Sequence, residues 1–195
     1  MIKKVNEKKI AYFLILFSAV DITYGFLLGF SQTFVEFCNI APLLLAYGIL
    51  TKRLYLIHFV ALFSALFQIP WTMDWVAQYV GIEFLNLYQT YQGLPYPFLI
   101  LSFVQHLLTL PVAIYLLYTS KRSSSKKREA LYIPLGIILV LALLSYDIGY
   151  LENANCIHYT CIEDLKPVLH GIRYTVSWVS IILLTWCVYW KVRLT

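Results

Sequence analysis

The chain has 195 residues, of which 61% are hydrophobic and 13% are charged, and its mean hydropathy is +0.72. A soluble domain cannot usually hide that much apolar surface, so the composition excludes an ordinary water-soluble fold and indicates a membrane protein. The formal net charge of +5 is spread in short runs between apolar segments, and no basic face typical of a nucleic-acid module is formed. We therefore expect membrane lipids, and no nucleic acid, as partners; the sequence sets no oligomeric state.

Six apolar segments are long enough to cross a hydrocarbon layer of about 30 Å as helices. Their continuous apolarity favours helices over a barrel, whose strands would alternate in polarity. The sequence thus predicts an all-α polytopic membrane protein, a single domain over residues 1–195 that forms a six-transmembrane-helix bundle. The expected spans cover residues 10–30, 34–51, 54–80, 97–119, 131–151 and 172–190.

The first and third spans have distinctive features. The first follows a lysine-rich start, but it is longer than a signal-peptide core and lacks a small-x-small cleavage site, so we expect an uncleaved span. The third is too long for a helix perpendicular to the membrane. A tilt, or a break at Pro70, would accommodate it.

Lysine and arginine set the expected orientation, because they concentrate on the cytoplasmic side of membrane proteins. With the N-terminus in the cytoplasm, the outer side holds only Lys166 and Arg173 of the 15 basic residues. Both termini are therefore expected in the cytoplasm. The cytoplasmic segments then hold Lys3, Lys4, Lys8, Lys9, Lys52, Arg53, Lys121, Arg122, Lys126, Lys127, Arg128, Lys191 and Arg193.

Polar side chains within the spans gather near the midplane and in the outer half of the bundle. A shared depth indicates a cavity open to the outer side, whereas the alternative is a set of separate interhelical hydrogen bonds. We expect the cavity, lined by Glu36, Asn39, Gln68, Asp74, Gln105, Asp147 and Arg173. Two prolines mark the same layer, because Pro42 and Pro111 cannot donate to the carbonyls of Cys38 and Leu107.

The sharpest chemical pairing at this depth is Cys38 with His106. A thiol reacts as the thiolate, and a nearby imidazole can take its proton. Asp21 is the best candidate for a carboxylate that orients the ring, with Glu36 or Asp74 behind it. The alternative is an inert buried cysteine and a histidine that bonds across helices.

The stretch VQHLLTLPVAIYLL (residues 104–117) resembles the histidine-bearing helix of the YwaF-like integral membrane family. The pair Cys38-Asn39, in a span closed by Lys52-Arg53, is similar to the family's second helix. That family includes a vertebrate six-helix acyltransferase that remodels ether phospholipids. The resemblance covers about half the chain, residues 34–120, and implies Cys38 as acyl nucleophile and His106 as base. Other members have His or Asp after the cysteine, and related ester hydrolases with a Thr nucleophile make hydrolysis a variant.

A last cluster lies in the expected outer loop before the sixth span, where Cys156, His158, Cys161 and His170 follow one another. Thiolate and imidazole are the usual zinc ligands, but the spacing C-x-H-x2-C-x8-H is not a standard zinc site. The loop faces an oxidising compartment, so a disulfide between Cys156 and Cys161 is the favoured reading over free thiols or a metal. No metal site is therefore predicted.

Together these features predict a membrane-embedded lipid acyltransferase or lipid-ester hydrolase whose active site lies in the outer half of the bundle. Cys38 is the expected nucleophile, His106 the base and Asp21 the orienting carboxylate, and no cofactor is required. A small-solute or proton-coupled transporter is the first alternative, because several ionisable groups lie at membrane depth. A non-enzymatic membrane scaffold or lipid-binding protein is the second.

Overall fold

The computed structural model describes residues 6–30, 36–82 and 94–119, together with 132–133, 136–137, 140, 176, 179–180, 182–184 and 187. All regular structure in these residues is helical, and they contain no strand. The short described pieces within the expected fifth and sixth spans are helical as well. Asp147, Arg173 and the Cys156–Cys161 pair lie outside the described residues.

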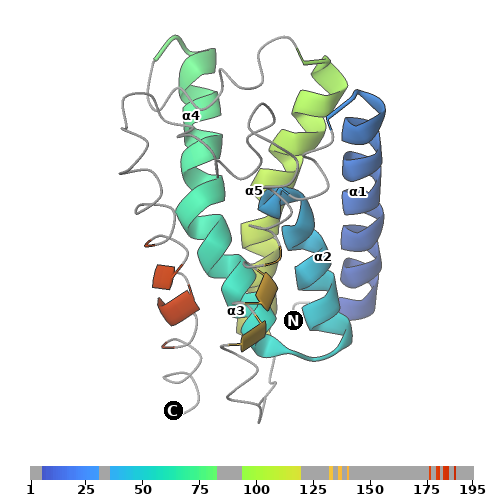
Figure 1. Cartoon of the computed structure of the whole chain (residues 1–195), viewed down its shortest axis with the longest axis vertical. Helices are drawn as coiled ribbons and strands as arrows, with labels where there is room; N and C mark the ends of the chain where they lie inside the picture. Colours follow the sequence, from blue (N-terminus) through green and yellow to red (C-terminus); the bar gives the residue numbers. More distant parts are fainter. Residues whose placement is uncertain are drawn as a thin grey trace, which may run out of the picture.

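Helix α1, Glu7–Leu27, is the first apolar helix (Figure 1). Asn6 caps its start, because the Asn6 side-chain oxygen accepts a hydrogen bond from the Lys8 backbone N–H at 3.1 Å. The helix ends just before Gly29, whose positive φ of 89° is a conformation that suits a residue without a side chain. The helix is therefore shifted by three residues toward the N-terminus from the predicted span.

Helices α2, Phe37–Leu50, and α3, Leu54–Phe63, form a tight antiparallel hairpin. The Arg53 N–H donates to the Gly48 carbonyl at 2.8 Å, and Lys52 between them has a positive φ of 57°. Gly48 allows this close approach, since a Cβ there would lie 3.3 Å from the Arg53 carbonyl oxygen. Residues of both helices join the main core, in which the Phe37 ring centroid lies 3.8 Å from that of Phe63.

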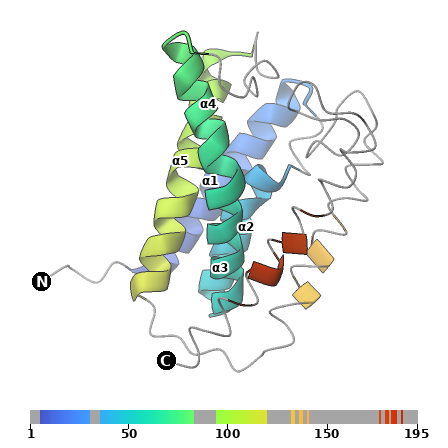
Figure 2. The ribbon, with the colours of Figure 1, turned by 90° about the vertical axis from the view of Figure 1, so that its left-hand side faces the viewer.

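The predicted third span forms one continuous helical rod, which runs beside α5 in Figure 2. Helix α3 runs directly into a π-helical turn, η2, Ser64–Gln68, and then into α4, Ile69–Tyr79. Pro70 lies in the first turn of α4 and has no N–H to give to the carbonyl four residues before it. The widened π turn is placed where this helical donor is missing, so the irregularity expected at Pro70 occurs on its N-terminal side.

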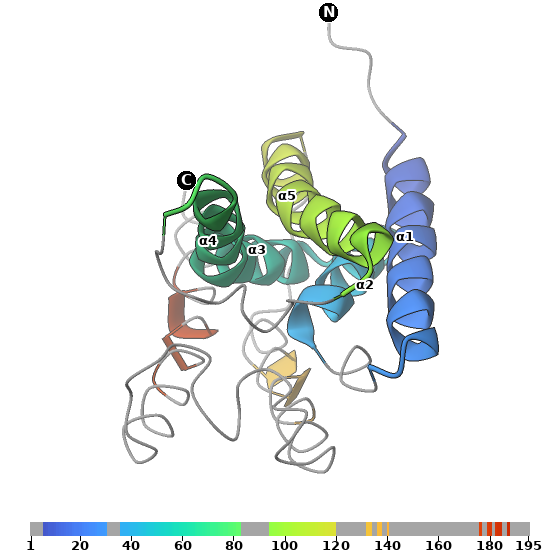
Figure 3. The same cartoon turned by 90° about the horizontal axis from the view of Figure 1, so that it is seen from above.

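Helix α5, Tyr96–Thr119, occupies the centre of the described bundle. It contacts α1, α2, α3, η2 and α4, and Figure 3 shows it above α2 and α3 with α1 and α4 at its sides. The predicted span of 97–119 therefore agrees with α5 to one residue. Because α5 contacts five other elements, its buried side chains can connect residues from most of the described bundle.

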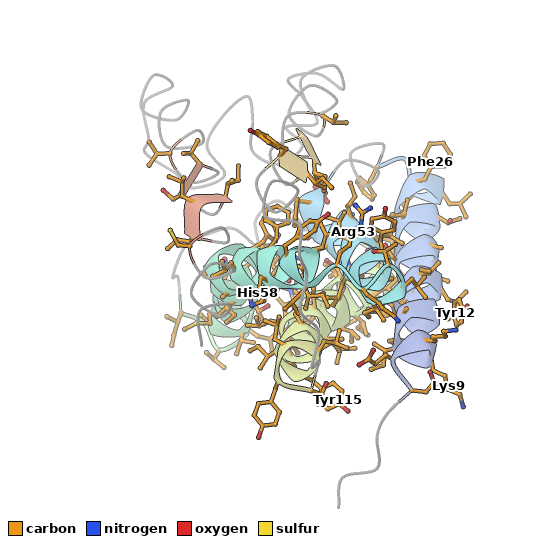
Figure 4. All side chains as sticks on the ribbon, turned by 90° about the horizontal axis from the view of Figure 1, so that it is seen from below. Lys9, Tyr12, Phe26, Arg53, His58 and Tyr115 are labelled. Atoms are coloured by element: carbon orange, nitrogen blue, oxygen red, sulfur yellow. The ribbon has the colours of Figure 1, made fainter. Side chains whose placement is uncertain are left out.

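Helices α1 and α5 are long and apolar enough to cross a membrane. Large apolar side chains on their outer faces are exposed: in Figure 4, Tyr12 and Phe26 point away from the bundle, and they are 60% and 54% exposed. Leu16 in the middle of α1 is 66% exposed. By contrast, His58 of α3 lies inside the bundle.

Candidate functional site

The first turn of α2 lies halfway along the bundle. The hydroxyl of Ser18, near the middle of α1, donates to the Asn39 carbonyl at 2.5 Å. Gln105, near the middle of α5, bonds to the same turn. Helix α2 therefore begins inside the bundle, where its polar groups are shielded from water and need hydrogen-bond partners from the protein. We call the residues that meet there the polar cluster: Ser18, Asp21, Glu36, Cys38, Asn39 and Gln105.

Cys38 is surrounded by acceptors from its own segment. Its sulfur lies 4.0 Å from Glu36 Oε2 and 3.6 Å from Asn39 Oδ1, and the Asn39 amide donates to Glu36 Oε2 at 3.4 Å. The backbone N–H groups of Cys38 and Asn39 also interact with the sulfur. Donors at the start of a helix stabilise negative charge. The thiol therefore has a carboxylate beside it that can receive its proton.

Gln105 satisfies the carbonyl that Pro42 leaves free. In a regular helix the residue at position 42 would donate to the Cys38 carbonyl, and proline cannot. The Gln105 Nε2 group donates instead to the Cys38 carbonyl at 2.5 Å and to Asn39 Oδ1 at 3.0 Å. The Cys38 carbonyl and Asn39 Oδ1 can only accept hydrogen bonds, so the Gln105 side chain must point its NH2 group, and not its oxygen, toward them.

Asp21 is the buried charge of the cluster. Its side chain is 1% exposed, and its Oδ1 atom has no hydrogen-bond partner among the described residues. The carboxylate interacts electrostatically with Glu36 and with the Cys38 thiol. Two carboxyl groups are therefore close enough to the sulfur to act on its charge.

His106 faces a different element from its neighbour Gln105. Its ring stacks on that of Trp71 in α4, with centroids 4.1 Å apart, and its Nδ1 lies 2.7 Å from the Ser102 carbonyl. A carbonyl only accepts, so Nδ1 carries the proton and Nε2 of the neutral ring keeps its lone pair. No hydrogen bond joins this ring to Cys38 or Asp21, all three of which are described. The Ser102 carbonyl, rather than Asp21, orients the ring.

Of the seven predicted cavity residues, five lie in the part of the chain that the structure describes, and Asp147 and Arg173 lie outside it. Glu36, Asn39 and Gln105 meet in the polar cluster. Gln68, at the end of the π turn, is 1% exposed, and neither atom of its amide has a partner among the described residues. Asp74 is fully buried and accepts from Gln78 of its own helix at 3.2 Å.

Two residues of the site were not predicted. Ser18 lies one helical turn before Asp21, and this spacing places both on one face of α1, which is the available sequence signal. Trp71 of α4 is the other, and its ring covers that of His106. Nothing in the sequence distinguishes an interfacial tryptophan from one that stacks on a buried histidine.

The chemistry open to the polar cluster is proton transfer and nucleophilic attack by a thiol. Within the described ranges, no three side chains of His, Cys, Asp and Glu are grouped so that they would hold a metal ion. Comparison of the sequence with family models and curated proteins, and of the structure with solved structures, gives no match. The resemblance to the YwaF-like family therefore stays a prediction.

Proposed function

We propose that the protein is a six-helix integral membrane protein with both termini in the cytoplasm. The spans that the structure describes, and the large apolar side chains exposed on α1 and α5, support insertion into lipid. The distribution of lysine and arginine supports the orientation. A reporter joined after Thr195 that is active only outside the cytoplasm would contradict this orientation by showing activity.

We further propose that the protein transfers acyl groups, as a lipid acyltransferase or an ester hydrolase, with Cys38 as nucleophile. One observation carries this proposal: the Cys38 thiol lies 4.0 Å from the Glu36 carboxylate, at the start of α2. A thiol needs a nearby base to react at neutral pH, and a site within the membrane has direct access to lipid esters. The family resemblance supports the same nucleophile.

In the first half-reaction, Cys38 passes its proton to the Glu36 carboxylate as the sulfur attacks the ester carbonyl carbon. The tetrahedral intermediate collapses to a thioester, and the leaving alcohol takes the proton from Glu36. The neighbouring carboxylates Asp21 and Glu36 oppose a free-standing thiolate, so proton transfer and attack are expected to occur together.

In the second half-reaction, we assign the role of base to His106 on the family resemblance, because no hydrogen bond among the described residues joins its ring to Cys38. Its Nε2 lone pair takes a proton from the acceptor, an alcohol or water, whose oxygen attacks the thioester. The thiol leaves and recovers that proton. Because Ser102 already holds the ring in the tautomer with a bare Nε2, no proton needs to be moved before this step.

An alkyne-tagged fatty acyl ester, supplied to the purified protein in detergent, tests this proposal. The wild-type protein is expected to carry a hydroxylamine-sensitive acyl group, which Cys38→Ala abolishes. Cys187→Ala is the matched control, because Cys187 is the other free cysteine in the described residues. Acylation that survives in Cys38→Ala would exclude Cys38 as the nucleophile.

The same assay separates the role of His106. His106→Ala is expected to acylate at near the wild-type rate and to lose the acyl group about 100-fold or more slowly, because only the second step needs this base. His58→Ala is the control, since His58 also bonds the carbonyl four residues back, with Nδ1 3.1 Å from the Leu54 oxygen. Equal turnover in His106→Ala and wild type would contradict this role.

A further inference from the structure

One helical hydrogen bond is missing at Cys38, the proposed nucleophile, because its carbonyl has no backbone donor four residues later. Pro42 removes the donor that would bond the Cys38 carbonyl, and it does so one turn into α2. The carbonyl lies in the bundle interior, where an unsatisfied acceptor destabilises the fold. A donor from elsewhere in the protein must therefore hold this turn.

Gln105 supplies that donor from another helix. The side chain is 1% exposed, and its Nε2 group bonds to both the Cys38 carbonyl and Asn39 Oδ1. The second bond fixes the Asn39 amide, whose own nitrogen donates to Glu36 Oε2. A single amide therefore connects the backbone of Cys38 with the carboxylate that faces the Cys38 sulfur.

We propose that Gln105 is a positioning residue, which sets the direction of the Cys38 thiol by holding the backbone that Pro42 leaves open. This inference rests on the proposed role of Cys38. Gln105 does not touch the reacting atoms; it acts on the first turn of α2, and through Asn39 on Glu36. Loss of the amide frees the turn to rotate, and the sulfur then leaves the position in which Glu36 can take its proton.

The test uses Gln105→Met, which keeps the side-chain volume and removes the donor. Acyl-enzyme formation is expected to slow by about 10- to 100-fold, as for other small misplacements of reacting groups. Adding Pro42→Ala restores a backbone N–H opposite the Cys38 carbonyl, so the double variant is expected to recover most of the lost rate. Thr109→Val is the control, because Thr109 is equally buried on α5 and its hydroxyl donates to the Gln105 carbonyl of the same helix.

A purely structural role of Gln105 predicts a different pattern. It would lower the melting temperature without a specific loss of acylation in the protein that remains folded, and Pro42→Ala would not restore the rate. A double variant as slow as Gln105→Met, or a single variant as fast as wild type, overturns the proposal. If Gln105→Met does not fold, Pro42→Ala must restore folding and acylation together, and failure to do so has the same consequence.

A second measurement keeps this inference distinct from the proposed function. The rate at which a small maleimide labels Cys38 reports the position of the thiol whether or not the protein transfers acyl groups. We expect this rate to change in Gln105→Met and to return toward wild type in the double variant. If wild type forms no acyl-enzyme but the maleimide rates follow this pattern, the proposed reaction fails and the positioning role stands.

Discussion

At the scale of single residues, Asp21 is the most costly group in the polar cluster. Its buried Oδ1 atom loses its hydration and gains no hydrogen bond from the described residues in return. Asp74 differs, because it is as deeply buried but accepts a bond from Gln78. Charged groups kept buried at such a cost are functional candidates, since selection for stability alone would remove them.

This difference predicts opposite effects for two matched substitutions. Asp21→Asn removes a charge whose Oδ1 atom has no hydrogen-bond partner among the described residues, and it is expected to raise stability by about 1 kcal/mol or more. Asp74→Asn weakens a charge-assisted bond and is expected to lower stability by about 1 kcal/mol. Thermal unfolding in detergent measures both. A loss of stability in Asp21→Asn equal to that in Asp74→Asn would contradict this account.

The residues of the cluster were predictable by type and depth, but not by direction. Adjacent residues on a helix point about 100° apart, so Gln105 and His106 cannot both face α2. The sequence shows both at the right depth, and only the rotation of α5 decides that Gln105 reaches Cys38 while His106 stacks on Trp71. That rotation depends on packing across five elements, which a single sequence does not display.

At the scale of helices, the predictions succeeded where long apolar runs end in polar or basic residues. The bounds of α2 and α5 agree with the expected spans to within three residues. The π turn was not predicted, because Pro70 indicates a missing donor without indicating how the helix absorbs it. A kink, a tilt and a widened turn are all compatible with the same sequence.

The hairpin between α2 and α3 gives a prediction about one glycine. An alanine Cβ at position 48 would lie 3.2 Å from Ile57 Cγ1 and 3.3 Å from the Arg53 carbonyl, and that backbone atom cannot move away easily. The crowding is expected to exceed the gain of about 1 kcal/mol in helix propensity, so Gly48→Ala lowers stability by about 1 kcal/mol or more.

Gly136 provides the matched control for this change. It is also helical, but a Cβ there has no neighbour within 4 Å. Gly136→Ala should therefore keep only the propensity gain and raise the melting temperature slightly. Equal effects of the two substitutions would show that close packing of the hairpin does not limit position 48.

At the scale of the whole molecule, the described residues combine a buried polar cluster with large apolar side chains on the outer faces of α1 and α5. The interior holds a hydrogen-bonded cluster of acids, amides and a thiol, while large apolar side chains cover the outside of α1 and α5. Lipid would solvate that outer surface, and the cluster would keep the polar groups away from it. The proposed chemistry depends on this arrangement, because ester substrates would reach Cys38 from the hydrocarbon side.

The exposed face of α1 separates a lipid environment from water in one experiment. Leu16 lies near the middle of α1 and is 66% exposed. In water, Leu16→Arg would be close to neutral, whereas at the centre of a spanning helix it costs about 2.5–3.5 kcal/mol. We therefore expect Leu16→Arg to reduce the fraction of protein that stays in membranes after alkaline carbonate extraction. Tyr118→Arg, at a 90% exposed position near the end of α5, should have little effect because it reaches the interface. Equal recovery of the two variants in the membrane fraction would mean that α1 does not face lipid.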